Sequence, residues 1–335
     1  LYEGDLDGEK QISRAGVRRS ADFSYQGRTE RTDYYVSLSH LNEEGNIIGS
    51  SFERTTARMN VNSKFKEWFK TGINLTGVIT DSNNAVDGVD NTSSFNNPFR
   101  TIRYMGPIYP VLKHDATGAV IYDAAGNPVY SDIRGSGASN GRNVIYETKN
   151  NIDANEGMTL GARTYVEFKF LKSFTFKSNL ALDRSQTNNV TYWNTVIGDG
   201  APDGYAARDN FIRNGLTFNQ ILEYTKSVNN HNISALLGHE SFDYETQYLT
   251  GTKRKQISAG NTEFVNFVTT SDLNSYTRNY ATESYFSRVG YDYKEKYIVS
   301  GSLRRDGSSK FAEDTQWGDF WSVGLAWNVA KENFL

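Results

Sequence analysis

The feature that most constrains this chain is an alternation of short and long connections between strands of period-two sequence. A Lys-bearing turn bracketed by aromatic residues occurs three times, as Phe65-Lys66-Glu67-Trp68-Phe69, Phe170-Leu171-Lys172-Ser173-Phe174 and Tyr293-Lys294-Glu295-Lys296-Tyr297. Each copy joins two segments in which polar and apolar side chains alternate, and long loops rich in Gly, Asn and Asp separate the copies. Short turns at one end of the strands and long loops at the other are typical of a transmembrane β-barrel.

The alternation predicts about eleven strands, many of them longer than the five or six residues usual in globular proteins. About ten residues of tilted strand are enough to cross a bilayer. We therefore predict an all-β, antiparallel, up-and-down transmembrane barrel. The predicted strands are 18–27, 33–42, 52–64, 69–81, 157–170, 174–187, 207–226, 231–244, 277–293, 297–306 and 318–329. The predicted longer connections are 43–51, 82–156, 188–206, 245–276 and 307–317.

Composition excludes several other classes of protein. The chain of 335 residues carries 36 Lys and Arg against 39 Asp and Glu, so no basic surface for nucleic acid is expected. A mean hydropathy of −0.61 and the lack of an apolar run near 18 residues exclude a transmembrane helix. The chain has no cysteine, which excludes disulfides and thiolate metal sites. A secreted β-sandwich or propeller remains as the alternative fold.

The two faces of the predicted strands have different partners. In a membrane barrel the apolar set meets lipid and the polar set lines the lumen. We expect Leu180 and Val323 to face lipid, and Asn179 and Arg304 to face the lumen. The aromatic residues beside the short turns are expected to lie at the membrane–water interface, although strand propensity alone could also explain them. These interface residues are Trp68, Phe69, Phe170, Phe174, Tyr293 and Tyr297.

The long connections are the expected place for external recognition, because loops beyond about 12–15 residues are usually functional. Connection 82–156 contains two Gly-bearing turn sequences and is predicted to carry a small hairpin. Aromatic rings in or near the loops could stack on sugar rings, pack their own loop or touch another protein. The candidate substrate contacts are Tyr104, Tyr109, Trp193, Tyr205 and Trp317.

Residues with metal-binding or catalytic chemistry are sparse. Asp81, Asp87 and Asp90 make an oxygen-rich stretch that could bind calcium, but their spacing matches no EF-hand and acidic loops are more often simply solvated. The string 137–141 matches the nucleophile pattern G-x-S-x-G but has no strand before it and no helix after it. We therefore expect no enzyme activity, no cofactor and no transition-metal site.

Several separated strings resemble the barrel of the SusC/RagA-like TonB-dependent transporters. They include Tyr34-Tyr35-Val36-Ser37-Leu38, Leu237-Gly238-His239-Glu240, Leu303-Arg304-Arg305-Asp306-Gly307 and Trp317-Gly318-Asp319-Phe320-Trp321. They occur in the order of that family and together span most of the chain. The matching strings are architectural, so no ligand-binding residue is carried over with them.

The resemblance implies a 22-stranded barrel with an N-terminal plug that imports glycans, peptides or similar nutrients across the bacterial outer membrane. It also implies energy from the TonB complex and a SusD-like surface lipoprotein as the partner that caps the barrel. Neither a plug nor a TonB box is recognised in these 335 residues. We therefore expect residues 1–335 to be an internal part of one barrel domain, about half of it, with the TonB contact lying in the missing N-terminal part. The alternative function is a secreted or surface β-protein that binds glycans or host ligands without transport.

Overall fold

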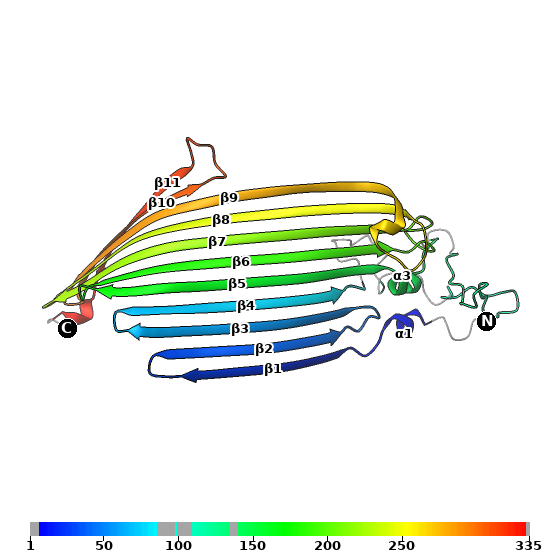
Figure 1. Ribbon diagram of the computed structural model, residues 1–335, viewed down its shortest axis with the longest axis horizontal. Coiled ribbons are helices and arrows are strands. Elements are labelled where there is room, and N and C mark those ends of the chain that lie inside the picture. The colour runs from blue at the N-terminus through cyan, green and yellow to red at the C-terminus, as the bar shows by residue number, and fades with distance from the viewer. Residues whose placement is uncertain (1–6, 86–97, 99–108, 134–139, 333–335) are drawn as a thin grey trace.

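The computed structural model describes residues 7–85, 98, 109–133 and 140–332. Its described strands form one antiparallel sheet of eleven strands in the order of the sequence, from β1 to β11. Each strand pairs with its sequence neighbours, and no pairing between β1 and β11 closes the sheet within the described residues. Figure 1 shows the strands side by side, with the short turns at one end and α1 and α3 at the other. The up-and-down topology predicted from the alternation is confirmed.

The strands are long, and their lengths rise overall from 12 residues in β1 to 27 in β9 before they fall to 12 and 11 in β10 and β11. The bounds are β1 Val17–Arg28, β2 Thr32–Glu44, β3 Ser51–Lys66, β4 Phe69–Asn83, β5 Ile152–Phe170, β6 Phe174–Trp193, β7 Tyr205–Val228, β8 His231–Gln256, β9 Phe267–Tyr293, β10 Tyr297–Ser308 and β11 Trp317–Trp327. Short helices accompany them in the described residues: α1 Gly8–Ile12, α3 Val144–Asn150, η1 Phe264–Asn266 and η2 Val329–Lys331. No helix in these described stretches is long and apolar enough to cross a membrane.

One predicted connection was wrong. Residues 245–276 were expected to form a loop, but β8 continues to Gln256 and β9 begins at Phe267, which leaves ten residues between them. The outward side chains in this part include Glu245 and Gln247, so apolar residues no longer alternate with polar ones. Strands that extend past the lipid have no need of an apolar face, and the period-two signal therefore disappears there.

The three repeated turns do not share one geometry. In the second and third copies, two consecutive residues have left-handed backbone: Leu171 and Lys172 at φ 48° and 58°, and Lys294 and Glu295 at 55° and 53°. Consecutive positive φ values match the twist of a tight hairpin, although non-glycine residues seldom adopt them. In the first copy the register between β3 and β4 shifts beside Lys64 instead.

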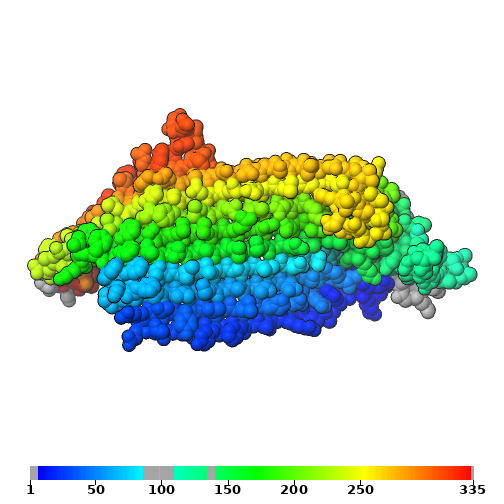
Figure 2. All heavy atoms as spheres, viewed as in Figure 1, coloured from blue at the N-terminus to red at the C-terminus, as the bar shows by residue number. Residues whose placement is uncertain are grey.

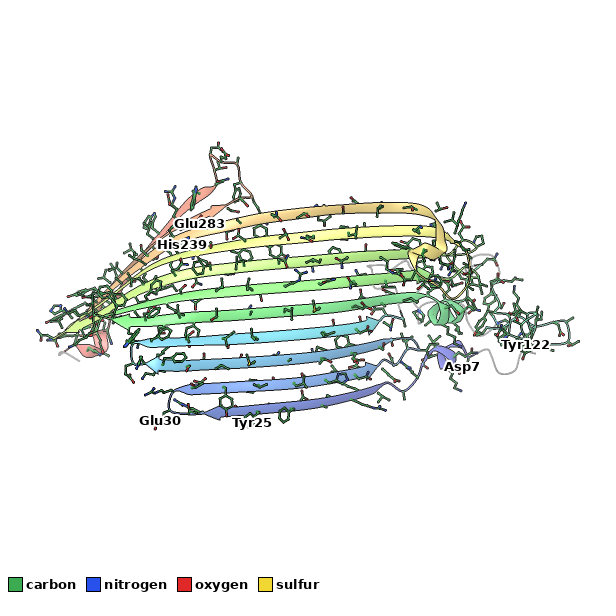
Figure 3. All side chains as sticks on the ribbon, in the orientation of Figure 1. Asp7, Tyr25, Glu30, Tyr122, His239 and Glu283 are labelled. Atoms are coloured by element: carbon green, nitrogen blue, oxygen red, sulfur yellow. The ribbon has the colours of Figure 1, made fainter. Side chains whose placement is uncertain are left out.

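The buried apolar residues gather at the long-connection end rather than between the strands. Ile12, Val111, Val144 and Ile145 form a cluster that joins α1, α3 and the segment 109–133. That segment projects beyond the strand ends as a narrow ladder, with Tyr122 near its tip (Figure 3). Two turns shape the ladder, with φ 90° at Gly118 and 85° at Gly126, and bridges join Leu112 to Tyr130 and His114 to Val120. The predicted hairpin in this connection is confirmed.

Candidate functional site

The strand register divides the sheet into an apolar face and a polar face. Because side chains alternate along every strand, a row of paired residues across the sheet lies on one face. One such row contains Ile73, Leu180 and Phe218. The adjacent row, one residue along each strand, contains Tyr165, Asn179 and Asn219. We call the first side the apolar face and the second the polar face.

The apolar face leaves many large hydrophobic side chains exposed, which is unusual for a water-soluble protein. Val323 and Leu325 of β11 are 68% and 78% exposed. On β6 the apolar stretch runs from Phe174 to Leu182, nine residues or about 26 Å of strand, and Ser178 is its one polar residue on this face. A charged residue, Arg184, is the next on this face. An apolar stretch of this length, repeated across neighbouring strands, fits the hydrocarbon thickness of a bilayer.

Polar groups mark the end of the apolar stretch that lies nearer the long connections. On β8 and β9, His239 Nε2 lies 3.2 Å from Glu283 Oε1, and His239 Nδ1 lies 2.7 Å from the Gln220 side chain. Figure 3 shows His239 and Glu283 on adjacent strands, part way along the sheet. On β8 and β9 the strand beyond this level carries polar residues on the apolar-face side as well, among them Asp243, Glu245 and Asn279, so these two strands extend past the lipid.

Aromatic rings mark the other end of the apolar stretch, at the short turns. Phe69 stacks on Phe168 with ring centroids 4.9 Å apart, and Phe170 stacks on Phe174 at 5.5 Å. Trp68 lies 6.2 Å from Phe168. Tyr293 and Tyr297 are paired across β9 and β10 on the same face. The six residues predicted at the interface therefore share the short-turn end of the sheet, and their contact with lipid headgroups stays a prediction.

The polar face is held together by side-chain contacts between strands. Asn179 donates a hydrogen bond to Asn219 at 2.6 Å, and Arg163 donates two to the Asp183 carboxylate at 2.9 and 3.1 Å. Lys177 lies over the Tyr165 ring at 5.0 Å from its centroid. Such contacts suit a surface that lines a water-filled lumen.

An aromatic stack stands on the polar face near the long-connection end. Phe211 of β7, Tyr248 of β8 and Tyr276 of β9 are directly paired. Their ring centroids lie 4.4 Å and 5.1 Å apart in order. Arg213 lies over the Phe211 ring and Arg278 over the Tyr276 ring. Sequence reasoning missed this group because it placed Tyr248 and Tyr276 in a loop.

The structure brings two of the predicted substrate contacts together and separates the others from them. Trp193 and Tyr205 pair at the far ends of β6 and β7, with stacked rings 4.3 Å apart, and Arg254 lies 5.0 Å from the Tyr205 centroid. These residues are on the polar face. Trp317 lies on the apolar face, 6.2 Å from Tyr285. Tyr109 is half-buried at the start of the projecting ladder, and Tyr104 lies outside the described residues. Their contact with a substrate stays a prediction.

The predicted calcium residues are mostly not described. Asp81 lies on the apolar-face side of β4, paired with Glu53 and Glu156 in the strand register, whereas Asp87 and Asp90 lie outside the described residues. Across the described ranges, no group of three or more His, Cys, Asp or Glu side chains could hold a metal ion. Most of the string 137–141 is also outside those ranges.

A buried ion pair fixes α3 against the neighbouring connection. Arg142 Nη1 donates to Glu147 Oε2 at 2.7 Å, with only 14% and 6% of the two side chains exposed, and Arg142 also pairs with Asp199. Burial raises the pKa of the Glu147 carboxyl, and the Arg142 guanidinium offsets only part of that effect. Asn143 caps the helix and donates to the Val111 and Ser131 carbonyls, both at 2.8 Å. These contacts tie the projecting ladder to the end of the sheet.

Comparison with known proteins agrees with this architecture. No protein-family model matches the chain. The chain is 26% identical to TonB-dependent receptor P39 and 27% identical to TonB-dependent receptor P3, both of Formosa agariphila, over 98% and 99% of its length. It is 22% identical to TonB-dependent receptor SusC of Bacteroides thetaiotaomicron over its whole length. The matches cover 30%, 32% and 33% of those proteins, so the chain spans about a third of the length of the curated relatives.

The solved structure of the RagAB peptide transporter has the same fold over 98% of this chain and 36% of its own chain, with a TM-score of 0.75 and 22% sequence identity. The sheet also has the two-faced, up-and-down architecture of a membrane barrel. The chain is thus a homologue of the SusC-like TonB-dependent receptors of the bacterial outer membrane, and its eleven strands correspond to a segment of their barrel.

Proposed function

We propose that this chain forms part of the wall of an outer-membrane importer that takes up oligosaccharides or peptides with energy from the TonB complex. The observation that carries the proposal is the sorting of side chains in the sheet. One face presents an apolar stretch of membrane thickness, and the other presents hydrogen-bonded polar groups. Backbone groups in hydrocarbon must all be paired, and a closed barrel is the only sheet that satisfies this requirement.

A partner at the long-connection end is part of the proposal. We propose that a SusD-like surface lipoprotein covers this end, as the similarity to SusC and to the RagAB structure suggests. The projecting ladder of residues 109–133 extends beyond the strand ends and is visible at the edge of the space-filling view (Figure 2). It is anchored by Asn143 and the Arg142–Glu147 pair, so it is presented in a fixed position for such a partner.

The test uses the whole protein in its own bacterium. The gene for the full-length chain is deleted and restored, and uptake of labelled oligosaccharides and peptides is measured with and without a functional TonB complex. The proposal predicts that uptake of at least one class of nutrient is lost on deletion and also lost without TonB. Nutrient binding at the cell surface with unchanged uptake would support the surface-binding alternative and contradict import.

A further inference from the structure

The polar face carries two arginines in one row, near the long-connection end. Arg213 of β7 and Arg278 of β9 are both paired with Thr246 of β8, which lies between them. Adjacent strands are about 4.8 Å apart, so the two Cα atoms are about 10 Å apart. Thr246, which has a short side chain, is the β8 residue that separates the two arginines in this row.

Both arginine side chains are exposed, and neither has a carboxylate partner among the described residues. Within the described residues, neither Arg213 nor Arg278 forms an ion pair, although other arginines of the same face do. Arg163 is paired with Asp183, and Arg304 with Asp306. An unpaired cation inside a lumen is free to take its counter-charge from a ligand.

The aromatic stack gives the two arginines a fixed position. The Arg213 guanidinium carbon lies 5.3 Å from the Phe211 centroid, and that of Arg278 lies 4.5 Å from the Tyr276 centroid. Tyr248 fills the space between those rings. Cation–π contact and ring packing reduce the freedom that each long side chain would lose on binding.

A third cation and several hydroxyl groups surround this pair. Lys310 Nζ lies 4.0 Å from the centroid of Tyr280, the next residue after Arg278 on the polar face of β9. Small hydroxyl side chains lie in the neighbouring positions of the same face: Ser185, Thr187, Thr246 and Thr250. Hydroxyl donors and acceptors are suited to sugar hydroxyls, and guanidinium groups bind carboxylates and sulfates through two parallel hydrogen bonds.

The backbone of this wall is not available to a peptide. β7, β8 and β9 are paired continuously through these rows, so a peptide cannot add to them as a further strand. Recognition must use side chains, and those present are mainly cations and hydroxyls on rigid supports, beside one carboxylate, Asp209, that accepts a hydrogen bond from the Tyr248 hydroxyl at 3.0 Å. We propose that Arg213 and Arg278, assisted by Lys310, bind the carboxylate or sulfate groups of an acidic oligosaccharide on its way through the lumen. This inference rests on the proposed import function.

The test uses the full-length transporter with its lipoprotein partner, purified in detergent. Binding is measured by calorimetry for four probes: a uronic-acid oligosaccharide, the same oligosaccharide after carboxyl reduction, a sulfated oligosaccharide and a glutamate-rich peptide. The variants are Arg213→Gln, Arg278→Gln and the double substitution. The matched control is Arg163→Gln, which removes the same charge from the same face but at a paired position. Heat-modifiable migration on gels confirms that each variant is folded.

We expect an acidic oligosaccharide to bind and the carboxyl-reduced oligosaccharide to bind at least about tenfold more weakly. Each single substitution is expected to weaken binding about tenfold, as the loss of one charge-assisted contact does, while Arg163→Gln stays within about twofold of wild type. Tyr276→Leu, which removes the support beneath Arg278, should weaken binding less than Arg278→Gln.

Three results would overturn the inference: equal binding of charged and neutral sugars, no effect of the Arg213 and Arg278 substitutions, or binding of the peptide with no binding of either acidic sugar. Absence of binding by all four probes would also count against it. Failure of the import function itself gives a different result, because deletion of the gene would then leave nutrient uptake unchanged.

Discussion

The facing of β6 makes the sharpest prediction about how this chain meets the membrane. Leu180 and Asn179 are neighbours in sequence, yet they lie on opposite faces of the sheet. Leu180 lies within the apolar stretch that runs from Phe174 to Leu182. An arginine at Leu180 would enter hydrocarbon, whereas an arginine at Asn179 would enter the polar lumen.

The expected magnitudes separate the two substitutions. A transmembrane barrel loses about 2–4 kcal/mol when arginine replaces a lipid-facing residue near the bilayer midplane. That cost corresponds to about 30- to 700-fold in the folding equilibrium. The Asn179→Arg change loses the hydrogen bond to Asn219 at 2.6 Å, which is worth about 0.5–1.5 kcal/mol. Leu180→Arg should therefore impair assembly much more than Asn179→Arg.

The assay is the folded fraction of the full-length protein in outer-membrane preparations, measured by heat-modifiable migration, together with guanidinium titrations in lipid bilayers. Leu180→Gln serves as the control for loss of the leucine side chain without the charge, and its defect should lie between the other two. Equal folded fractions for Leu180→Arg and Asn179→Arg would refute the facing derived from the register.

Four further predictions concern the two ends of the sheet. Arg142→Ala leaves the buried Glu147 carboxylate without its cation, so the free energy of opening the projecting ladder should fall by about 3–5 kcal/mol and its hydrogen exchange should accelerate. Adding Glu147→Gln, which removes the unpaired charge, should suppress the effect. Burial raises the pKa of Glu147, so the packing of α3 against the projecting ladder should become more stable as pH falls through that raised pKa. Hydrogen exchange of the ladder amides should then slow, and it should speed up as pH rises through the same pKa. A hydrogen bond from the Thr117 hydroxyl lowers the pKa of Asp115, and hydrogen bonds from backbone N–H groups lower it further. The turn that Asp115 holds should therefore loosen as pH falls through that lowered pKa, and hydrogen exchange of the turn amides measures this. With Trp68 as the single tryptophan, brominated lipid should quench its emission, whereas Trp193 as the single tryptophan should be quenched little; equal quenching would contradict the interface assignment.

The membrane-embedded part of the fold could be predicted from the sequence because a strand in the bilayer must place apolar residues toward lipid and polar residues toward the lumen, in alternation. Leu180 is apolar because it lies on the face that meets lipid, and Asn179 is polar because it lies on the opposite face. The eleven predicted strands are all present. Outside the bilayer that rule no longer applies. The second half of β8, with Glu245 and Gln247 on one side and Thr246 and Tyr248 on the other, gave no apolar alternation to detect.

The loop-end contacts were beyond sequence reasoning for a different reason. The Asn143 cap followed by Glu147 is a recognisable helix start, so α3 could have been proposed. The third member of its ion group, Asp199, lies more than fifty residues further along the chain, and only the folded sheet brings it to Arg142. The aromatic stack with Arg213 has the same origin, since its rings come from three different strands.

The central claim is that the apolar face meets lipid and the polar face meets water. Spin labels attached one at a time to positions 176–183 of the full-length protein in bilayers test it directly, and this chain has no cysteine of its own to interfere. Accessibility to oxygen should be highest at the even positions, including Leu180 and Leu182, and accessibility to a polar nickel complex should be highest at the odd ones, including Asn179 and Asp183. Accessibility without a period of two, or with the two sets exchanged, would contradict the account.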